Sequence, residues 1–346
     1  MPSKKPESAA PSAASKGNKT VKPEHAAFLD ALEERNIELA SQPDHKRDSI
    51  KRLILKQSLP NPSKVEEANW EADMLKCDIA YEAMFHRTIM MDLIDRHKLD
   101  KKLDYICEIS WNCERMPRNM PVDALPTCQP RPDLAVAFKR SSLINTPKFT
   151  KLQTLRTQMC PEVTTDEKGE RRAFHFFSLE AKKPDAHKGE SLASLQNLNT
   201  ATQALHNIYV FMKRAQMEKV FFEKVRFYSI IATSQVFEVR VHRAVELDAD
   251  VHIQHDYPLG FRHDVLLKIK SEHYEKAKVF HIVRNILTGY GVKILHPLLK
   301  RAVEKVLRKL SQTTTRTSIG KRPADGLLES FGSAQRRRLD ELDVED

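Results

Sequence analysis

The sequence predicts an α/β (α+β) fold, in which a central mixed sheet is flanked by helices. Two short apolar segments, residues 134–138 and 174–179, are each bounded by charged residues or proline, which is typical of buried strands. An apolar stripe at helical spacing follows over residues 190–216, and residues 226–233 and 236–242 indicate two further strands. Helix, strands, helix and strands in this order predict a sheet covered by helices.

The N-terminal part is predicted to be a disordered tail followed by helices. Residues 1–23 are rich in Ser, Ala, Pro and Lys, a composition that does not form a core. Residues 24–62 are predicted to be a helical extension of the main domain, which covers residues 63–310. One long helix is expected over residues 64–97, because Ser63 and Glu66 form a capping box at its start.

The middle of the domain alternates strands with proline-rich connections. Residues 103–109 form a mixed apolar segment, and five prolines over residues 117–132 predict a loop that ends where the 134–138 strand begins. An insertion, residues 139–172, joins the two apolar strands, with a helix expected over residues 149–159.

The C-terminal part is predicted to contain a hairpin, an amphipathic helix and a charged tail. Ser234 and Gln235 would form the two-residue turn of the hairpin. Residues 296–310 carry an apolar face and a basic face. Residues 311–346 are expected to be disordered, and their clusters Lys321-Arg322 and Arg336–Arg338 resemble a bipartite nuclear localisation signal, which predicts a nuclear protein.

Composition narrows the class of protein. The net charge is +10, and most of it lies outside the two tails, which suits a polyanionic partner such as nucleic acid. Only 9 glycines occur, and neither GxGxxG nor GxxxxGK[ST] is present, which argues against a Gly-rich nucleotide-binding fold. An odd number of cysteines, 5, without a CxxC pair predicts a reducing compartment. No apolar leader and no long apolar run occur, so neither secretion nor membrane insertion is expected.

Three charged residues stand where the two apolar strands begin or end. Asp133 follows Pro132 at the start of one strand, while Glu180 and Lys182 lie on one face at the end of the other. Charged groups at the end of a core strand are costly unless they are paired, bind a metal or face a cleft. Two carboxylates would hold a divalent cation through oxygen ligands, and the lysine would orient a water. The alternative is an ordinary strand end with a solvated Glu-Lys pair.

These residues resemble the motif of the PD-(D/E)XK nuclease superfamily, with Pro132-Asp133 followed by Glu180-Ala181-Lys182. Four segments are similar to a fungal family of uncharacterised PD-(D/E)XK-like proteins, namely SWN at 110–112, RPDLAVAFKRSS at 131–142, FFSLEAKKP at 176–184 and LQNLNTATQAL at 195–205. The resemblance covers roughly residues 66–310 and implies a restriction-endonuclease-like core with extra N-terminal helices and a C-terminal helix.

The resemblance implies a site that holds Mg²⁺ or Mn²⁺. Asp133 and Glu180 would bind the metal, and Lys182 would position the attacking water and stabilise charge on the phosphate. A helix before the strands often adds an acid in this superfamily, which makes Glu67 the first candidate and Glu71 the second.

Other residues are weaker candidates for the same site. Glu108 is a further candidate acid, since it also lies close upstream of Asp133, and Gln196 corresponds to a supporting Gln on the helix after the strands. Acids near a helix N-terminus are also common for the helix dipole alone. Lys183 and Lys188 would hold flanking phosphates.

The function predicted from these residues is a metal-dependent nuclease that hydrolyses phosphodiester bonds in DNA, with DNA favoured over RNA. The alternative is a catalytically inactive nuclease-fold protein that binds nucleic acid or another partner in the nucleus. The insertion at residues 139–172 is expected near the site, as a DNA-contacting flap or a lid. The sequence does not indicate an oligomeric state.

Overall fold

The structure is a computed structural model. It describes residues 26–56, 61–79, 82–111, 116–117, 129–163, 171–182, 187–252, 257–270 and 274–319. The chain divides into two units, Met1–Leu307 and Arg308–Asp346, and the fold that follows is that of the first unit.

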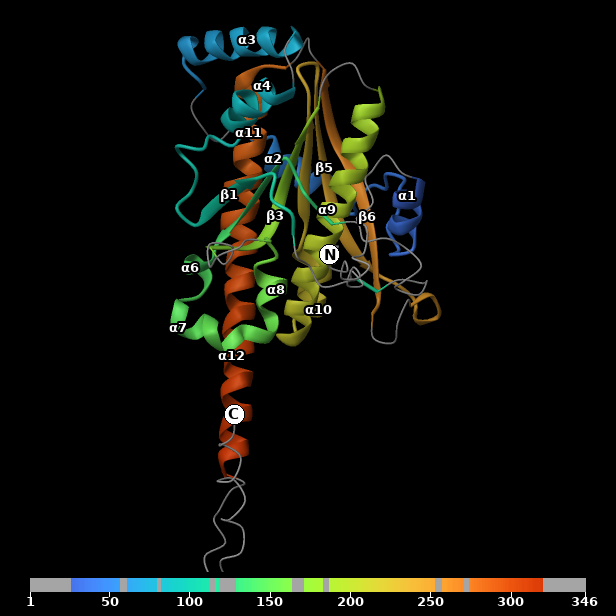
Figure 1. Ribbon diagram of the computed structural model, residues 1–346, viewed down its shortest axis with the longest axis vertical. Helices are drawn as coiled ribbons and strands as arrows, with labels where there is room; N and C mark the ends of the chain where they lie inside the picture. The colour runs from blue at the N-terminus through green and yellow to red at the C-terminus, as the bar shows by residue number, and fades with distance from the viewer. Residues whose placement is uncertain are drawn as a thin grey trace, which may run out of the picture. The chain divides into compact units, whose positions relative to one another are not determined.

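Six strands of the described chain form one mixed sheet, which is the centre of the fold (Figure 1). Their spatial order follows the chain: β1 (Leu103–Cys107), β2 (Leu134–Lys139), β3 (Arg172–Ala181), β4 (Phe227–Ala232), β5 (Val236–Glu246) and β6 (Leu259–Lys270). Neighbouring strands are antiparallel, except that β3 and β4 are parallel. A parallel pair needs a crossover, which α9 (His187–Arg214) and α10 (Glu218–Lys224) provide. The predicted mixed sheet flanked by helices is confirmed.

The turn between β4 and β5 shows how a hairpin forms without the usual turn residues. The Val236 carbonyl accepts a hydrogen bond from the Thr233 amide at 2.8 Å. The Thr233 hydroxyl in turn accepts from the amides of Gln235 and Val236. A side-chain acceptor therefore fixes the Ser234-Gln235 turn that the sequence predicts.

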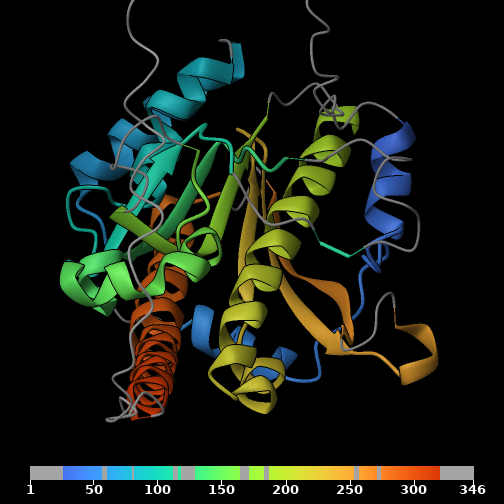
Figure 2. The same ribbon diagram turned by 60° about the horizontal axis from the view of Figure 1, so that its bottom comes forward.

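Opposite faces of the sheet carry different helices. On β4, the Tyr228 ring contacts Tyr290 of the C-terminal helical segment, while the next residue, Ser229, points to the other face. Ser178 pairs with Ser229 across β3 and β4, and its hydroxyl donates to Asn197 Oδ1 of α9 at 2.8 Å. The helix α9 therefore covers the face that carries Ser178, and Figure 2 shows it running along the sheet.

The second face is covered by one continuous helical segment. It consists of α11 (Lys276–Arg284), a π-helical stretch (Asn285–Leu295) and α12 (His296–Ile319), of which residues up to Leu307 belong to the first unit. A Cβ atom at Gly291 would lie 2.5 Å from the Phe176 ring, so only glycine allows this close approach to the sheet. The π-helical stretch thus holds Gly291 and Tyr290 against residues of β3 and β4.

The N-terminal helices are α1 (Ala26–Glu33), α2 (Arg47–Ile54), α3 (Lys64–Ile79), α4 (Glu82–Arg87) and α5 (Ile89–Leu93). The capping box is confirmed, because the Ser63 amide donates to Glu66 Oε2 at 2.8 Å and the Glu66 amide donates to Ser63 Oγ at 3.3 Å. The single helix expected over residues 64–97 is wrong. Thr88 has φ −109° and ψ −85°, which is not helical and separates α4 from α5.

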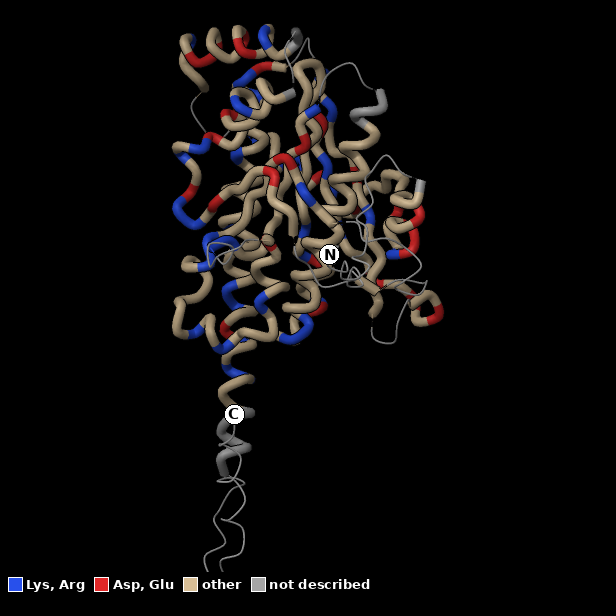
Figure 3. Tube along the Cα trace, in the orientation of Figure 1, with Lys and Arg blue, Asp and Glu red and all other residues tan. Residues whose placement is uncertain are grey.

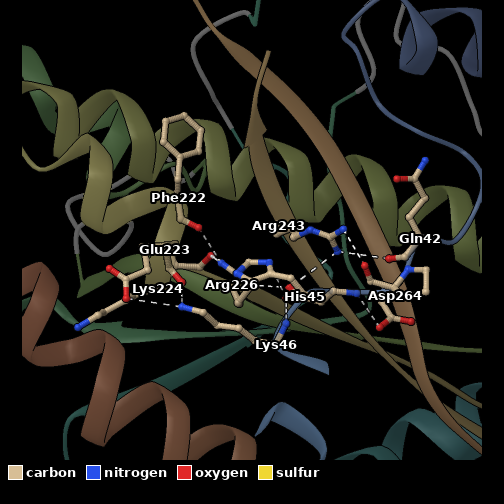
Figure 4. Close-up of polar contacts among 12 residues, drawn as sticks. Gln42, His45, Lys46, Phe222, Glu223, Lys224, Arg226, Arg243 and Asp264 are labelled. Atoms are coloured by element: carbon tan, nitrogen blue, oxygen red, sulfur yellow. Dashed lines mark hydrogen bonds and ion pairs between the residues drawn. The ribbon is translucent and has the colours of Figure 1, made fainter. Parts of the chain in front are cut away.

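The segment before α2 belongs to the edge of the sheet. Ile37 forms a parallel bridge with Phe261 of β6, where the Glu38 amide donates to the Phe261 carbonyl at 2.9 Å. Beyond this bridge, the buried Asp44 carboxylate lies 2.8 Å from Arg226 Nε. Figure 4 labels Arg226 and Arg243 among the polar contacts of this region. The extension therefore covers β6, whose backbone would otherwise be an open edge.

The insertion between β2 and β3 contains α6 (Arg140–Leu143), α7 (Thr146–Phe149), a 3₁₀ segment (Thr150–Leu155) and α8 (Arg156–Met159). The helix expected over residues 149–159 is thus only in part α-helical, since Leu152 has non-helical φ and ψ. These elements follow Lys139, at the opposite end of β2 from Asp133, and lie away from α4 in Figure 1. The expected position beside the site is therefore wrong for these helices. Glu162 and Val163, later in the insertion, pair with Trp111 and Ser110, and residues 164–170 lie outside the described residues.

Candidate functional site

The two motif strands bring Asp133 and Glu180 to the same end of the sheet. Leu134 of β2 pairs with Leu179 of β3, so the residues next to this pair, Asp133 and Glu180, stand opposite each other. Lys182 continues β3, because its amide donates to the Ala232 carbonyl of β4 at 3.0 Å. Register alone therefore places two acids and one lysine together.

Side-chain contacts join these residues into one cluster. The Asp133 Oδ2 atom accepts hydrogen bonds from the Ala181 amide at 2.8 Å and from Lys182 Nζ at 3.1 Å. The same Lys182 Nζ lies 3.6 Å from Glu180 Oε2. The lysine therefore bridges the two carboxyl groups, and Asp133, Glu180 and Lys182 converge in space.

Glu180 has the most unusual environment in the cluster. Its side chain is fully buried, and neither carboxyl oxygen has a hydrogen-bond partner among the described residues. Burial raises the pKa of this carboxyl well above its ordinary value, and the negative charge of Asp133 raises it further, while Lys182 opposes both. The protonated form is therefore favoured unless a cation replaces the proton.

His86 of α4 is a member of the site that sequence reasoning missed. Its Nε2 atom lies 3.6 Å from Asp133 Oδ2 and 3.5 Å from the Ala181 carbonyl oxygen. Its Nδ1 atom lies 3.5 Å from Glu108 Oε1. A single histidine on a helix far from the motif gives no sequence signal, so only the fold reveals this position.

Glu108 stands at the rim of the cluster. Its φ of 52° is left-handed, and its amide donates to the carbonyls of Pro132 and Asp133 at 3.1 and 3.2 Å. The carboxylate is half exposed and also lies 3.5 Å from Arg131 NH2. Among the three candidate helix or loop acids, Glu108 is thus the one that shares a partner, His86, with Asp133.

Glu67 and Glu71 lie elsewhere. Glu67 Oε1 accepts a hydrogen bond from the Ala277 amide at 3.1 Å, so it caps the first turn of α11. Glu71 is exposed on α3. The expectation that Glu67 is the third metal ligand is therefore wrong, because its carboxylate binds the start of α11 and not the cluster of Asp133.

Gln196 lies on α9, over the face of the sheet that carries Glu180. The next residue, Asn197, accepts from Ser178 and donates from Nδ2 to the Ile230 carbonyl at 3.4 Å. The Gln196 Oε1 atom is buried and has no hydrogen-bond partner in the part of the chain that the structure describes. An unsatisfied buried acceptor calls for a water or ligand beside it, which keeps Gln196 a candidate without a demonstrated contact.

The structure does not describe the side chains of the two lysines that are expected to hold phosphates. Lys183 lies outside the described residues, and Lys188 lies in the first turn of α9, where its side chain is not described. The clusters at residues 321–322 and 336–338 also lie outside the described ranges.

The donor atoms of the cluster fit a hard divalent cation in kind. Carboxylate oxygens are the ligands that Mg²⁺ and Mn²⁺ prefer. The oxygens of buried Glu180 have no hydrogen-bond partner among the described residues, and a bound ion would be a partner for them. Asp133 would share the ion at the cost of its contact with Lys182. Within the described ranges, however, no group of three or more His, Cys, Asp or Glu side chains is placed to hold a metal. The fit therefore rests on two carboxylates.

A separate hollow of about 540 Å³ opens beside the C-terminal half of α9. Its lining includes Tyr209, Lys213, Glu246, Asp248 and His252. Lys213 lies more than four turns along α9 from Asn197, the residue that marks the site end of the helix. The hollow mixes both signs of charge and is distinct from the Asp133 cluster.

None of the helices in the described part of the chain combines the length and the apolar character needed to cross a bilayer. This finding agrees with the absence of a long apolar run in the sequence.

Comparison with known proteins gives a family but no activity. No curated protein matches the chain. A family model described as a domain of unknown function (DUF7924) matches residues 88–301, which is more than half of the chain and includes β1 to β6. His86 lies just before this range, while Asp133, Glu180 and Lys182 lie inside it. The chain therefore belongs to the family of the domain of unknown function DUF7924.

Proposed function

We propose that the protein is a metal-dependent nuclease that hydrolyses phosphodiester bonds in DNA. The observation that carries the proposal is the convergence of Asp133, Glu180 and Lys182, in which one ammonium group bridges two carboxyl groups at the end of neighbouring strands. Ordinary strand ends do not bury a carboxyl without hydrogen-bond partners, because its desolvation is costly.

Each residue of the cluster has a role in the proposed reaction. Asp133 and Glu180 would hold Mg²⁺ or Mn²⁺, and the bound ion would supply a water of lowered pKa and an electrostatic partner for the phosphate. Lys182 would orient that water and stabilise the negative charge that develops on the phosphorane. His86 would hold Asp133 in place from α4, since its Nε2 atom lies 3.6 Å from Asp133 Oδ2.

A polyanionic substrate is supported by charge. The chain carries 57 Lys and Arg against 47 Asp and Glu, which gives the net charge of +10. Because positive charge raises the local concentration and association rate of a polyanion, this balance suits a nuclease. We also propose, from the motif residues, that the chain is a member of the PD-(D/E)XK superfamily, as in the fungal family that it resembles.

The proposal is tested with supercoiled plasmid incubated with purified protein and Mg²⁺ or Mn²⁺. Wild type is expected to nick the plasmid, and EDTA is expected to stop the reaction. Asp133→Asn, Glu180→Gln and Lys182→Met are each expected to lower the rate at least about 100-fold, because each removes a group that acts in the transition state.

Asp104→Asn is the matched control, since Asp104 is a partly exposed acid on β1 that contacts Arg172 rather than the cluster. This variant is expected to keep the wild-type rate. Equal nicking by wild type and the three cluster variants would mean that the activity comes from a contaminant, and the proposal would be rejected.

The second candidate function is a nucleic-acid-binding module without catalysis. It is favoured by the lack of a third metal ligand in the described ranges and by the contacts that already compensate Asp133. Binding of DNA with equal affinity in EDTA and in Mg²⁺, without nicking, would select this function.

A nuclear location is part of the same proposal. The two basic clusters, Lys321-Arg322 and Arg336–Arg338, support it through their resemblance to a bipartite import signal. A fluorescent fusion is expected to accumulate in the nucleus, and replacement of Arg336, Arg337 and Arg338 by Ala is expected to redistribute it.

A further inference from the structure

The first half of the insertion between β2 and β3 is strongly basic. Residues 139–156 contain five Lys or Arg and no Asp or Glu. The next acid along the chain, Glu162, is buried and bound by Arg172 and His175, so its charge is already compensated. Figure 3 shows that Lys and Arg predominate over Asp and Glu around α6, α7 and α8.

Hydrogen bonds join this segment to basic residues from two other elements. The Lys139 amide donates to the Lys102 carbonyl at 2.7 Å, which places the turn before β1 beside the end of β2. The Ser142 hydroxyl lies 3.1 Å from His296 Nε2 at the start of α12. Lys300 follows His296 by one helical turn and is exposed on the same side.

We define the basic end surface by five lysines that three segments contribute: Lys102, Lys139, Lys148, Lys151 and Lys300. All are exposed except Lys102, which is half-buried. Acids near these lysines include Asp100, which accepts from the Lys102 amide at 2.9 Å, and the exposed Glu304, one helical turn after Lys300. Asp104 of β1 is paired with Arg172, which lies opposite Lys139. Positive charge from three separate segments thus gathers at one end of the sheet.

The electrostatics of His296 reflect this gathering. Burial lowers the pKa of its imidazole below the ordinary value, and the charges of Lys102 and Lys300 lower it further against the opposing effect of Asp100. This direction agrees with the hydrogen bonds that bring the segments of Lys102 and Lys300 together beside Ser142 and Lys139.

The position of this surface separates it from the Asp133 cluster. Asp133 precedes the first residue of β2 and Lys139 is its last, so about 20 Å of strand lies between them. A duplex that contacts both would span roughly half a helical turn or more, since a turn is about 34 Å long.

We propose that the basic end surface binds the phosphate backbone of duplex DNA, as a contact separate from the site of hydrolysis. The choice of DNA as the polyanion rests on the proposed function. A lipid surface is disfavoured, because membrane-binding surfaces insert apolar side chains. In the fully described segment 139–156, the large apolar residues all point inward: Leu143, Ile144, Phe149, Leu152 and Leu155 are buried.

The test measures binding of a labelled duplex of about 30 base pairs in EDTA, where no metal-dependent cleavage occurs. The triple variant Lys139→Ala, Lys148→Ala and Lys300→Ala is expected to raise the Kd at least about 10-fold at fixed salt. The slope of log K against log salt is expected to fall by about 3, since each lost phosphate contact contributes about 1.

The matched control removes three exposed lysines from other parts of the fold, Lys64, Lys98 and Lys224, with the same change in net charge. Its Kd is expected to rise less than about 3-fold. Equal loss in both triple variants, no DNA binding by wild type, or binding to phosphatidylserine vesicles in place of DNA would each overturn the inference. Equal melting temperatures confirm that the variants fold.

These outcomes are independent of the nuclease assay. If the triple variant binds the duplex more weakly than wild type but wild type does not nick plasmid, this inference stands and the proposed hydrolysis is rejected. If wild type nicks plasmid but the triple variant binds the duplex as tightly as wild type does, the proposed hydrolysis stands and this inference is rejected.

Discussion

Lys182 Nζ donates a hydrogen bond to Asp133 Oδ2 at 3.1 Å, across the junction between β2 and β3. The two residues are separated by a long insertion in the chain, yet the antiparallel register of the strands brings them together. The same ammonium lies 3.6 Å from Glu180, so Lys182 neutralises part of the charge that two neighbouring carboxyl groups would carry.

Glu180→Gln is expected to abolish metal binding while changing the stability of the metal-free protein little. The amide resembles the uncharged carboxyl that burial favours, because burial raises the pKa of Glu180 well above its ordinary value. The free energy of unfolding without metal is therefore expected to change by less than about 1 kcal/mol. Stabilisation by Mg²⁺ or Mn²⁺, measured as the rise in Tm with added metal, is expected to disappear.

Glu238→Gln is a control for this measurement. Glu238 lies on β5 in the same row across the sheet, but Arg240 and Lys268 already pair with it at 2.6 and 3.5 Å. The rise in Tm with metal is expected to persist in this variant. A Glu180→Gln protein that is still stabilised by Mn²⁺ as strongly as wild type would show that Glu180 is not a ligand.

Asp44→Ala is expected to destabilise the protein by about 3–5 kcal/mol, because it leaves buried cations uncompensated. Asp44 Oδ2 lies 2.8 Å from Arg226 Nε and 3.8 Å from Arg243 NH1. Burial acts to raise the pKa of Asp44, but Arg226 and the Lys46 amide outweigh it and lower the pKa. The free energy of unfolding in urea measures the effect.

Asp48→Ala provides the comparison, since Asp48 is exposed in the first turn of the neighbouring helix α2. Its loss is expected to cost less than about 1 kcal/mol. A similar small cost for Asp44→Ala would mean that the segment before α2 is not anchored through this carboxylate.

The sequence predicts the strands of the site because their signals are local. Residues 134–138 and 174–179 are apolar runs next to charge, and the structure turns both into buried strands of nearly these bounds. The pairing of Asp133 with Lys182 follows from the strand register, once the two strands are taken as neighbours. Both inferences needed only the period of a strand and the place of the charged residues.

The rest of the site depends on contacts between distant segments, which no local pattern records. His86 reaches Asp133 from α4, which ends where Thr88 interrupts the helical conformation. The sequence between residues 64 and 97, in contrast, predicts one uninterrupted helix. Glu67 is a good candidate by position, but it caps α11, an element about 200 residues later in the chain. Strand β6 also lacks a regular alternation of buried and exposed residues, so its sequence carries no clear strand signal.

His206 is expected to make the protein less stable in mild acid. Burial lowers the pKa of its imidazole to about 4, with a further contribution from Arg35, while the unfolded chain has a pKa of about 6.5. The unfolded state therefore binds more protons between these values, and stability is lost as the pH falls through this range. From pH 7 to pH 5, this residue is expected to contribute about 2 kcal/mol of the loss.

His206→Gln is expected to reduce the acid sensitivity by that amount, although it also weakens the 2.8 Å contact of His206 Nδ1 with the Tyr257 hydroxyl. The comparison is therefore the change in unfolding free energy between the two pH values, not its absolute value. His97→Gln, at an exposed position, is expected to leave the pH dependence unchanged. Identical pH slopes for wild type and His206→Gln would contradict the assignment.

Arg172→Met is expected to destabilise the protein by about 3–5 kcal/mol, because Glu162 would remain as a buried charge. Arg172 Nε and NH2 donate to the two Glu162 oxygens at 2.6 and 2.7 Å. Burial acts to raise the pKa of Glu162, but hydrogen bonds from His175 and Arg172 lower it. The carboxylate therefore stays ionised inside the protein only while these donors are present.

The double variant Glu162→Gln with Arg172→Met is expected to recover at least about 1–2 kcal/mol of this loss, because the charge that lacked a partner is gone. Arg171→Met is the control, since Arg171 precedes it in the chain and is exposed. Unfolding in urea measures all four proteins. If Arg172→Met and Arg171→Met were equally stable, the Glu162 carboxylate would have to be neutral or hydrated, and the ion pair would not hold the start of β3 in place.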